Sequence, residues 1–329
     1  MAPVNALAEP LLYQAPPDVC AKWMEAMMKG DFEAAWKQTD RIELPRQAAE
    51  RRGPFIRADH HLVWNGTPFD NRRVLIRCEH GLGDSIQFLR YIPRLRQRAR
   101  SVILKVQPML LQLFTGMPSI DLLRDAWTTD PDPAHDVAIE CMEFPYALRD
   151  TVDTIPAEVP YLPVEQIRAS SRVWKFRDER RLNVGLIWAA SSWDPTRSVG
   201  LERLAPLAAV EGVRFFSLQQ GPEATEAESA PFPITVLSPH TREIVDAAAA
   251  MLSLDLIITV DGMTAHLAGA LGRPVWMLLQ EHADWRWMQE RNDSPWYPTM
   301  RLFRQPQQGA WSEVVAQVAQ ALGETTKSE

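Results

Sequence analysis

The sequence has few cysteines, no excess of positive charge and no long apolar run. Its three cysteines, Cys20, Cys78 and Cys141, are widely spaced and odd in number, which excludes a zinc-ligand pair and argues against a disulfide framework. The formal net charge of −7 argues against a general nucleic-acid binder, because such proteins present a basic surface. No apolar run is long enough to cross a bilayer. We therefore expect a reduced, cytoplasmic protein that is not transmembrane and binds no nucleic acid.

Composition and length indicate a globular protein of two ordinary domains. Hydrophobic residues make up 46% and charged residues 23% of the 329 residues, which is typical of folded chains. Strand-like and helix-like patterns alternate along most of the chain, and this alternation predicts an α/β protein with parallel sheets. We expect a helical hairpin with its lead-in over 1–60, a first α/β domain over 61–165 and a second over 166–329.

The clearest local pattern lies between Asp255 and Leu279. Residues 256–260 form a short apolar run rich in β-branched side chains, as expected for a strand buried on both faces. Helical spacing begins at Met263, and residues 275–279 have the character of the next buried strand. The stretch therefore predicts a strand, a tight polar turn, a helix and a second strand.

The turn in this stretch has the features of an anion site. The amides of Gly262, Met263 and Thr264 stand at the start of the helix, where they lack partners within it, so with the helix dipole they suit a diphosphate. His266 lies in the first helical turn. A purely structural interpretation, in which Asp261 only caps the helix and His266 only packs in the core, explains the pattern about as well as an anion site does.

A second strand–turn–helix pattern begins at Arg73. A short strand over 73–77 leads into a turn with Gly81 and Gly83, and helical spacing follows over 86–95. Glycines at such a turn permit unusual backbone geometry and close ligand approach. The third glycine of a dinucleotide fingerprint is missing, so a dinucleotide site is poorly supported. Asp84 follows this turn, where a general base and a helix cap are both open interpretations.

The N-terminal region predicts two helices within residues 18–43, joined by a turn at Gly30. The pair resembles one tetratricopeptide unit, which cannot bury its own faces and must dock on something. A hairpin packed on the main body and an element that binds a protein partner or a second copy are both open. We expect residues 45–71 to be irregular and the acidic pair Asp130 and Asp132 to lie in a solvated loop.

Three longer stretches together resemble a known family. They are residues 62–95, residues 182–207 with 213–221, and residues 255–279 followed by 284–305. They are similar to bacterial glycosyltransferase family 9, which includes the heptosyltransferases, and to related tetratricopeptide-containing proteins. The resemblance covers about residues 62–322. It implies a GT-B fold of two Rossmann-like domains, with the acceptor bound mainly by the first and a nucleotide-sugar by the second. It also implies an inverting transfer to a hydroxyl of a glycan, a lipid-linked glycan or a protein, without a metal or cofactor.

The same resemblance implies roles for individual residues. Asp84 matches the family's candidate base, and the turn of Asp261, Gly262, Met263, Thr264 with His266 matches its diphosphate-binding segment. Positions expected on the donor side of the cleft are Arg197, Ser198, Gln219, Asp284 and Trp285.

Two positions depart from the family pattern. Gly262 stands where relatives commonly have threonine, and Gln220 stands where they often have lysine. These departures keep open a catalytically weak binding or assembly protein on the same fold. A nucleotide-sugar epimerase is the third hypothesis, and its candidate acid and base groups are Glu79, Glu140 and Glu143.

Overall fold

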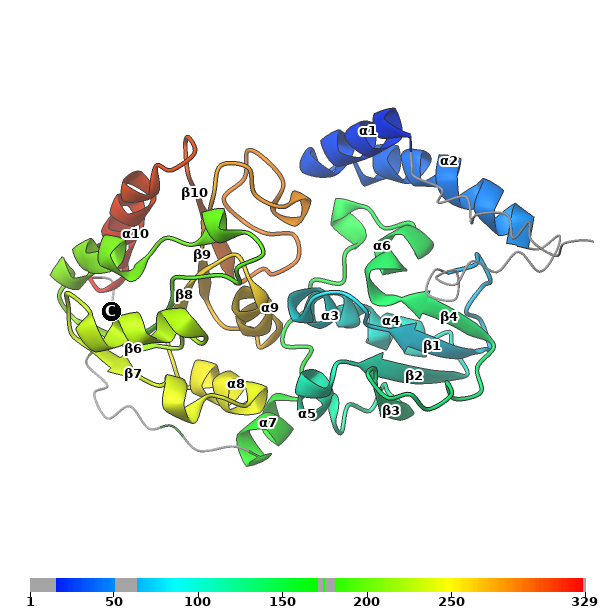
Figure 1. Cartoon of the computed structure of the whole chain (residues 1–329), viewed down its shortest axis with the longest axis horizontal. Coiled ribbons are helices and arrows are strands. Elements are labelled where there is room, and N and C mark those ends of the chain that lie inside the picture. Colours follow the sequence, from blue (N-terminus) through cyan, green and yellow to red (C-terminus); the bar gives the residue numbers. More distant parts are fainter. Residues whose placement is uncertain (1–15, 51–63, 171–173, 175–180, 328–329) are drawn as a thin grey trace, which may run out of the picture.

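Two parallel sheets form the body of the protein, as the alternation of strands and helices predicts. The computed structural model describes residues 16–50, 64–170, 174 and 181–327. Figure 1 shows the two sheets in separate lobes, with the N-terminal helices lying against both. None of the described helices combines the length and the apolar character that crossing a lipid bilayer requires.

The N-terminal lobe is built on a sheet with the strand order β3-β2-β1-β4. All neighbouring strands are parallel, and β1 and β2 are almost wholly buried. The strands are β1 (Arg73–Arg77), β2 (Ser101–Val106), β3 (Leu122–Asp125) and β4 (Val137–Glu140). The helices are α3 (Leu82–Phe88), α4 (Ile92–Arg96), α5 (Leu111–Phe114) and α6 (Phe144–Ala147), and α7 (Val164–Ser170) leads towards the other lobe.

The C-terminal lobe has a larger parallel sheet with the order β10-β9-β8-β5-β6-β7. Its central strands β5 and β8 are fully buried, which explains their continuous apolar sequences. The strands are β5 (Leu182–Ile187), β6 (Val213–Ser217), β7 (Ile234–Val236), β8 (Leu256–Val260), β9 (Val275–Leu279) and β10 (Met300–Arg304). The helices are α8 (Ile244–Leu252), α9 (Met263–Ala270) and α10 (Trp311–Thr325).

Each sheet has a point at which its strand order reverses. In the N-terminal lobe this point lies between β1 and β4, and in the C-terminal lobe it lies between β5 and β8. Ligands of open parallel sheets bind outside the carboxyl ends of the strands at such points. Because α3 follows β1 and α9 follows β8, the start of each helix marks the ligand-binding end of its sheet.

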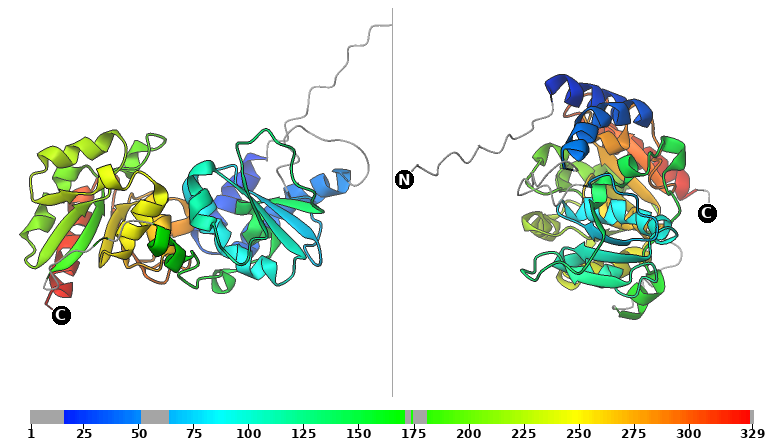
Figure 2. Two further views of the ribbon diagram at one scale, coloured as in Figure 1. Left: turned by 90° about the horizontal axis from the view of Figure 1, so that it is seen from below. Right: turned by 90° about the vertical axis from the view of Figure 1, so that its right-hand side faces the viewer.

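The two lobes touch through the starts of these two helices. Figure 1 shows α3 and α9 side by side at the centre of the molecule, and Figure 2 shows the same contact between lobes from below. A Cβ added at Gly83 would lie 2.9 Å from His266 Cδ2 and 3.3 Å from Met263 Cα. Neither Gly81 nor Gly83 has a positive φ. Glycine is therefore needed at position 83 because the C-terminal lobe packs too closely there to leave room for a side chain.

A buried arginine joins the lobes behind this contact. Arg90 is 2% exposed, and its guanidinium lies 4.4 Å from the centre of the Tyr297 ring. It donates hydrogen bonds to the Tyr161 hydroxyl and to the Trp296 carbonyl oxygen. Cation–π contacts are strongest where water is excluded, so this cluster fixes the lobes relative to each other.

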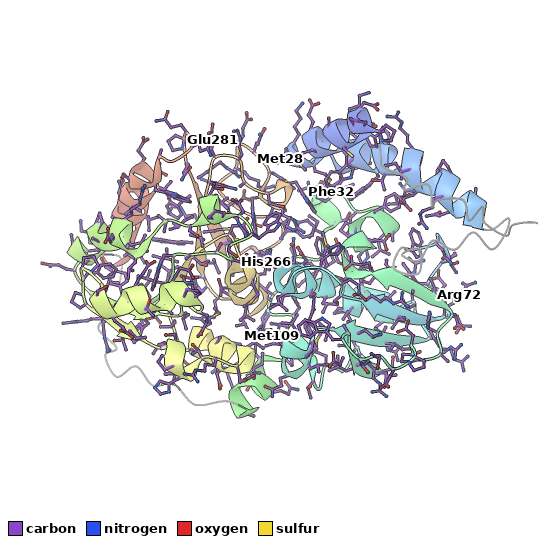
Figure 3. All side chains as sticks on the ribbon, viewed as in Figure 1. Met28, Phe32, Arg72, Met109, His266 and Glu281 are labelled. Atoms are coloured by element: carbon purple, nitrogen blue, oxygen red, sulfur yellow. The ribbon has the colours of Figure 1, made fainter. Side chains whose placement is uncertain are left out.

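The N-terminal hairpin consists of α1 (Pro17–Met28) and α2 (Phe32–Glu50), and it docks on both lobes. On the N-terminal lobe, Trp36 Nε1 donates to the Asp150 carbonyl oxygen at 2.7 Å. On the C-terminal lobe, the Gln289 amide donates to the Met28 carbonyl oxygen at 2.9 Å. In Figure 3, the labels Met28 and Phe32 mark the turn between α1 and α2. The predicted hairpin is thus present, and its inner face packs on the body.

Four local predictions differ from the structure. The helix after β1 begins at Leu82 instead of near residue 86, and α2 continues through Pro45 to Glu50 instead of ending near residue 43. Strand β10 was not predicted. Asp132 does not simply face solvent, because it forms ion pairs with Lys105 at 2.7 Å and with Arg77.

The domain limits remain predictions. The limit between 60 and 61 lies outside the described residues, and the limit between 165 and 166 falls inside α7, whose bounds are Val164–Ser170.

Candidate functional site

A cleft of about 1330 Å³ lies between the lobes. Its walls come from the carboxyl ends of β1, β5, β6, β8 and β9 and from α1 of the hairpin. Twelve of the thirteen predicted site residues line it, and they come from both lobes. They are Gly81, Gly83, Asp84, Arg197, Gln219, Asp261, Gly262, Met263, Thr264, His266, Asp284 and Trp285. The exception is Ser198, whose hydroxyl oxygen accepts a hydrogen bond from the Ala190 amide at 3.0 Å.

The turn after β8 opens directly onto the cleft. Gly262 has an extended backbone with φ 178°, and a Cβ added there would meet no atom within 4 Å. Glycine is therefore not required here by strain, and any side chain at 262 would project into open space. The Thr264 hydroxyl lies 3.2 Å from the Thr259 hydroxyl, so it is anchored to the end of β8. Gly262, Met263 and Thr264 at the start of α9 all line the cleft, and a helix start that borders open space suits an anion.

Asp261 is a buried carboxyl group at this turn. Burial raises its pKa to about 6, with the neighbouring Asp284 acting in the same direction and Arg197 and Arg286 opposing it. The same carboxyl would ionise near pH 4 in water. Asp261 therefore changes charge close to neutral pH, and an anion bound beside it would favour its protonated form.

His266 lies between the lobes, as its label in Figure 3 shows. Its Nδ1 is 3.0 Å from the Tyr297 hydroxyl, and its ring stacks on the Trp287 ring at 5.3 Å between centroids. Burial lowers its pKa well below the ordinary value, and the charges of Arg286 and Arg90 act in the same direction. His266 is consequently neutral at physiological pH, and it offers the cleft a polar ring without a formal charge.

Two of the donor-side residues, Arg197 and Gln219, are held by hydrogen bonds to neighbouring backbone groups. Arg197 donates to the Asp261 carbonyl oxygen at 3.2 Å and lies over the Trp193 ring at 5.3 Å. The Gln219 side chain accepts from the Trp188 and Ala189 amides at 3.0 and 2.9 Å. Arg197 can thus offer charge to a ligand, whereas Gln219 shapes the loop around it.

Gln220, at the position where relatives often have lysine, has a structural role. Its Nε2 donates to the Thr241 hydroxyl at 2.9 Å and to the Ser238 carbonyl oxygen at 3.2 Å. It therefore fastens the loop after β7 to the end of β6, and it adds no charge to the cleft.

Asp84 both caps α3 and faces the cleft, so the two interpretations of this residue are compatible. Its Oδ2 accepts from the Gly81 amide at 3.0 Å, which is the cap of a helix that begins at Leu82. Its Oδ1 accepts from Arg286 Nη2 at 2.6 Å, and 26% of its side chain remains exposed. Each carboxylate oxygen has a further lone pair, so a proton can still reach it from the cleft side.

Sequence reasoning missed Arg286, which connects the two lobes at the centre of the site. Besides Asp84, it donates to Asp284 Oδ1 at 2.7 Å and to Gln87 Oε1 at 2.8 Å. Its guanidinium lies 4.7 Å from the Trp285 ring centre and its side chain is only 8% exposed. Burial opposes its charge, but Asp284 and Asp84 outweigh that effect and raise the pKa of Arg286. The one signal in the sequence was an arginine between two tryptophans.

Sequence reasoning also missed the contribution of the hairpin. Trp23 and Met24 of α1 line the cleft, and Trp23 packs edge-on against Trp285 with 5.6 Å between ring centroids. The apolar stripe of α1 was visible in the sequence, but its docking position was not.

None of the three carboxyl groups proposed for an epimerase, Glu79, Glu140 and Glu143, lines the cleft. Glu140 accepts from the Met142 amide at 2.7 Å, and Glu143 accepts from the Trp64 amide at 2.8 Å. Burial raises the pKa of Glu143 to about 7. Because none of these carboxyl groups lines the cleft, no observation favours them as acid and base groups for a sugar.

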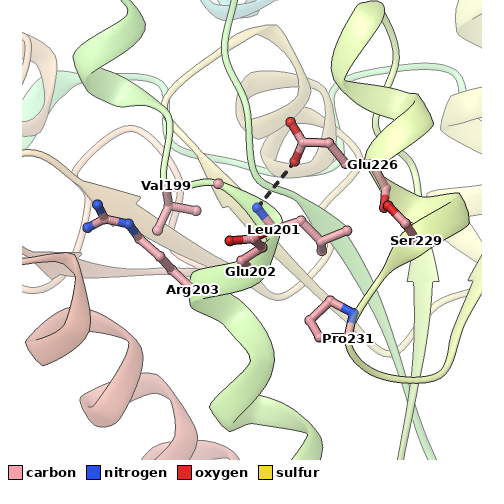
Figure 4. Close-up of a pocket in the computed structure, with 8 residues that line it drawn as sticks. Val199, Leu201, Glu202, Arg203, Glu226, Ser229 and Pro231 are labelled. Carbon is pink, nitrogen blue, oxygen red and sulfur yellow. Dashed lines mark hydrogen bonds between the residues drawn. The ribbon is translucent and has the colours of Figure 1, made fainter.

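A smaller pocket of about 390 Å³ lies elsewhere on the C-terminal lobe, between the 3₁₀ helices η7 (Leu201–Ala209) and η8 (Pro222–Ser229). Figure 4 shows its Glu226 accepting a hydrogen bond from the Leu201 amide at 3.4 Å, and the same carboxylate accepts from Trp188 Nε1 at 2.9 Å. None of the predicted site residues lines it. We therefore place the candidate site in the cleft between the lobes.

The part of the chain that the structure describes contains no group of three or more His, Cys, Asp or Glu side chains suited to hold a metal ion. Independence from metal and cofactors stays a prediction.

In sequence, this chain is similar to a curated protein over most of its own length. No family model matches the chain. The curated protein FlbA from Caulobacter vibrioides is 26% identical over 287 residues, which cover 79% of this chain and 48% of the relative. This chain thus spans about half the length of the curated relative it matches.

Two solved structures share the arrangement of both lobes. The E. coli heptosyltransferase WaaC superimposes with a TM-score of 0.54 at 13% identity, covering 77% of this chain and 99% of that chain. A glycosyl transferase family 9 protein from Veillonella parvula gives a TM-score of 0.50 at 14% identity, covering 79% and 90%. The chain has the GT-B fold of these proteins. The predicted pair of Rossmann-like domains with parallel sheets is confirmed.

Proposed function

We propose that this protein is an inverting glycosyltransferase that moves a sugar from a nucleoside diphosphate donor to a hydroxyl group. One observation carries the proposal: Asp84 of one lobe and the open turn at Asp261–Thr264 of the other line the same cleft. Heptosyltransferase WaaC, which has the same fold, has been solved with ADP-2-deoxy-2-fluoro heptose, a donor of this class.

In the proposed reaction, the amides at the start of α9 and the guanidinium of Arg197 hold the diphosphate. As the acceptor oxygen attacks the anomeric carbon, the bond from that carbon to the diphosphate oxygen breaks, and the electron pair leaves with the nucleoside diphosphate. The acceptor proton passes to the Asp84 carboxylate. The dipole of α9 and Arg197 stabilise the negative charge that grows on the leaving group.

The placement of the groups supports inversion. The base belongs to the N-terminal lobe and the leaving-group site belongs to the C-terminal lobe, an arrangement that allows attack and departure on opposite sides of a sugar bound between them. A single displacement of this kind inverts the anomeric carbon. It needs no covalent intermediate and no metal, because the amides and arginine carry the charge stabilisation.

Arg286 is a positioning residue in this scheme. It holds the Asp84 carboxylate by a bond of 2.6 Å while Asp284 fixes the guanidinium from the other side. The Arg286–Asp84 bond joins the base on the N-terminal lobe to the C-terminal lobe, which carries the proposed donor site. Both halves of the site therefore keep their relative position.

The experiment is a transfer assay with purified protein, a panel of nucleotide-sugars and mass spectrometry of the products, with release of nucleoside diphosphate as a second readout. Asp84→Asn should lower transfer about 10²–10⁴-fold while nucleoside diphosphate binding is kept. Asp130→Asn, in an exposed loop of the same lobe, is the matched control and should retain full transfer. Equal turnover in Asp84→Asn and the control would remove Asp84 from the mechanism.

A further inference from the structure

The N-terminal hairpin forms a wall of the cleft next to Asp84. The hairpin is held on the N-terminal lobe by the ion pair of Asp40 with Arg149 at 2.6 Å and on the C-terminal lobe by its contact with Gln289. It thereby places Trp23 and Met24 over the cleft. Because both anchors are in the described fold, this wall belongs to the site itself.

The wall that the hairpin completes is apolar. Leu82 and Met142 of the N-terminal lobe line the cleft beside Trp23 and Met24, and Trp285 faces them from the other lobe. Met24 is 46% exposed, which is unusual for methionine and leaves its side chain free for contact with a ligand. Methionine and tryptophan offer adaptable apolar contact and few hydrogen bonds.

In the described part of the chain, the arginines that line the cleft lie on the opposite lobe. Among the described residues that line the cleft, the arginines are Arg197 and Arg286, and both belong to the C-terminal lobe. The charge of Arg286 is already matched by Asp84 and Asp284. On the Asp84 side the basic side chain is His80, which is 58% exposed and lies 3.9 Å from the Glu140 carboxylate. Among the described residues that line this side of the cleft, an anionic acceptor would therefore meet the Asp84 carboxylate and no lysine or arginine.

We propose that the hairpin and the N-terminal lobe form an acceptor subsite that selects an uncharged hydroxyl compound with an apolar or aromatic face, and that excludes phosphorylated acceptors. This inference rests on the proposed function, which makes Asp84 the group that receives the acceptor proton. The apolar wall holds the carrier of the hydroxyl, and the absence of arginine and lysine on that wall of the described cleft disfavours anions.

The test measures probe binding without any donor, so that it does not depend on turnover. Saturation-transfer NMR with the full chain would use two uncharged probes and one anionic probe. The uncharged probes are phenyl β-D-glucopyranoside and a capped pentapeptide with one threonine between two valines. The anionic probe is glucose 6-phosphate. We expect at least one uncharged probe to bind more tightly than glucose 6-phosphate. The uncharged probe that binds more tightly then shows whether the acceptor hydroxyl is carried by a glycoside or by a peptide.

The decisive variant is Met24→Glu, which introduces one negative charge at an exposed position of the wall. It should raise the Kd of the bound uncharged probe at least tenfold, while Met24→Leu keeps it. Lys22→Glu is the matched control, because it changes the charge by two units on another face of α1, where the side chain is 59% exposed. A nonspecific charge effect would be larger in the control.

Three results would overturn the inference: equal or tighter binding of glucose 6-phosphate, no binding of either uncharged probe, or the same Kd in Met24→Glu and Lys22→Glu. The proposed function is judged separately, by the rise in Tm on adding nucleoside diphosphates to the same variants. If that rise is absent from the wild type, the transferase proposal fails, whereas the probe result still decides the character of the subsite.

Discussion

Replacing Arg286 with methionine tests the link between the lobes. The arginine makes two charge-assisted hydrogen bonds, to Asp84 at 2.6 Å and to Asp284 at 2.7 Å, and a third to Gln87 at 2.8 Å. Removing one partner of a buried ion pair typically costs about 3–5 kcal/mol. Asp84 and Asp284 keep 26% and 37% of their side-chain exposure, so water reaches the carboxylates that remain. We therefore expect a loss of about 2–3 kcal/mol in the free energy of unfolding.

The assay is urea unfolding followed by tryptophan fluorescence. The control is Arg291→Met, which makes the same substitution at a residue that does not line the cleft, in the ion pair with Asp293, whose side chain is 65% exposed. That change should cost about 0–1 kcal/mol. In both variants methionine preserves most of the packing of the arginine stem. An Arg286→Met protein as stable as the Arg291→Met protein would refute the claim that this arginine joins the lobes.

Two further predictions concern the lobe contact and the buried carboxyl. Gly83→Ala should cost about 1–3 kcal/mol in urea unfolding, because the new Cβ would lie 2.9 Å from His266 Cδ2. Gly323→Ala, in α10 with no atom within 4 Å of the new Cβ, should instead add about 0.5–1 kcal/mol, and equal effects would contradict the packing argument. The raised pKa of Asp261, about 6, means that folding favours its protonated form, so its stabilising effect is full below pH 4 and is lost as pH rises through 6. Asp261→Asn should therefore gain about 2–2.5 kcal/mol relative to the wild type between pH 4 and pH 7.5, and a difference independent of pH would show that Asp261 titrates normally.

Much of the fold was predictable because its strands are buried in parallel sheets. The predicted limits of β1, β8 and β9 agree with the structure. Strands of this kind need continuous apolar sequences, which stand out between polar turns. Strand β10 was missed because it lies at the edge of its sheet, where Arg301 is exposed and the sequence MRLFR alternates in character.

The candidate site was predictable where one short segment carries several of its groups. The turn after β8 and Asp84 could be found because each lies at a strand–helix junction of recognisable pattern. Arg286 could not, because its partner Asp84 is 202 residues away in the chain and only the packing of two lobes brings them together. Trp23 and Met24 were not predicted for the same reason. An apolar stripe shows that a helix packs against another surface, but it does not show which surface.

The most direct test of the central claim is the Tm of the wild type and of Gly262→Asp with UDP, GDP, ADP, CDP or dTDP, each with and without magnesium. A Cβ at 262 meets no atom within 4 Å, so the variant should fold normally while its carboxylate projects into the proposed diphosphate site. The account predicts that one nucleotide raises the Tm of the wild type, without need of magnesium, and fails to raise that of Gly262→Asp. If no nucleotide raises the Tm of the wild type, or if the variant responds equally, the cleft is not a diphosphate-sugar site and a binding or assembly role on this fold becomes the better account.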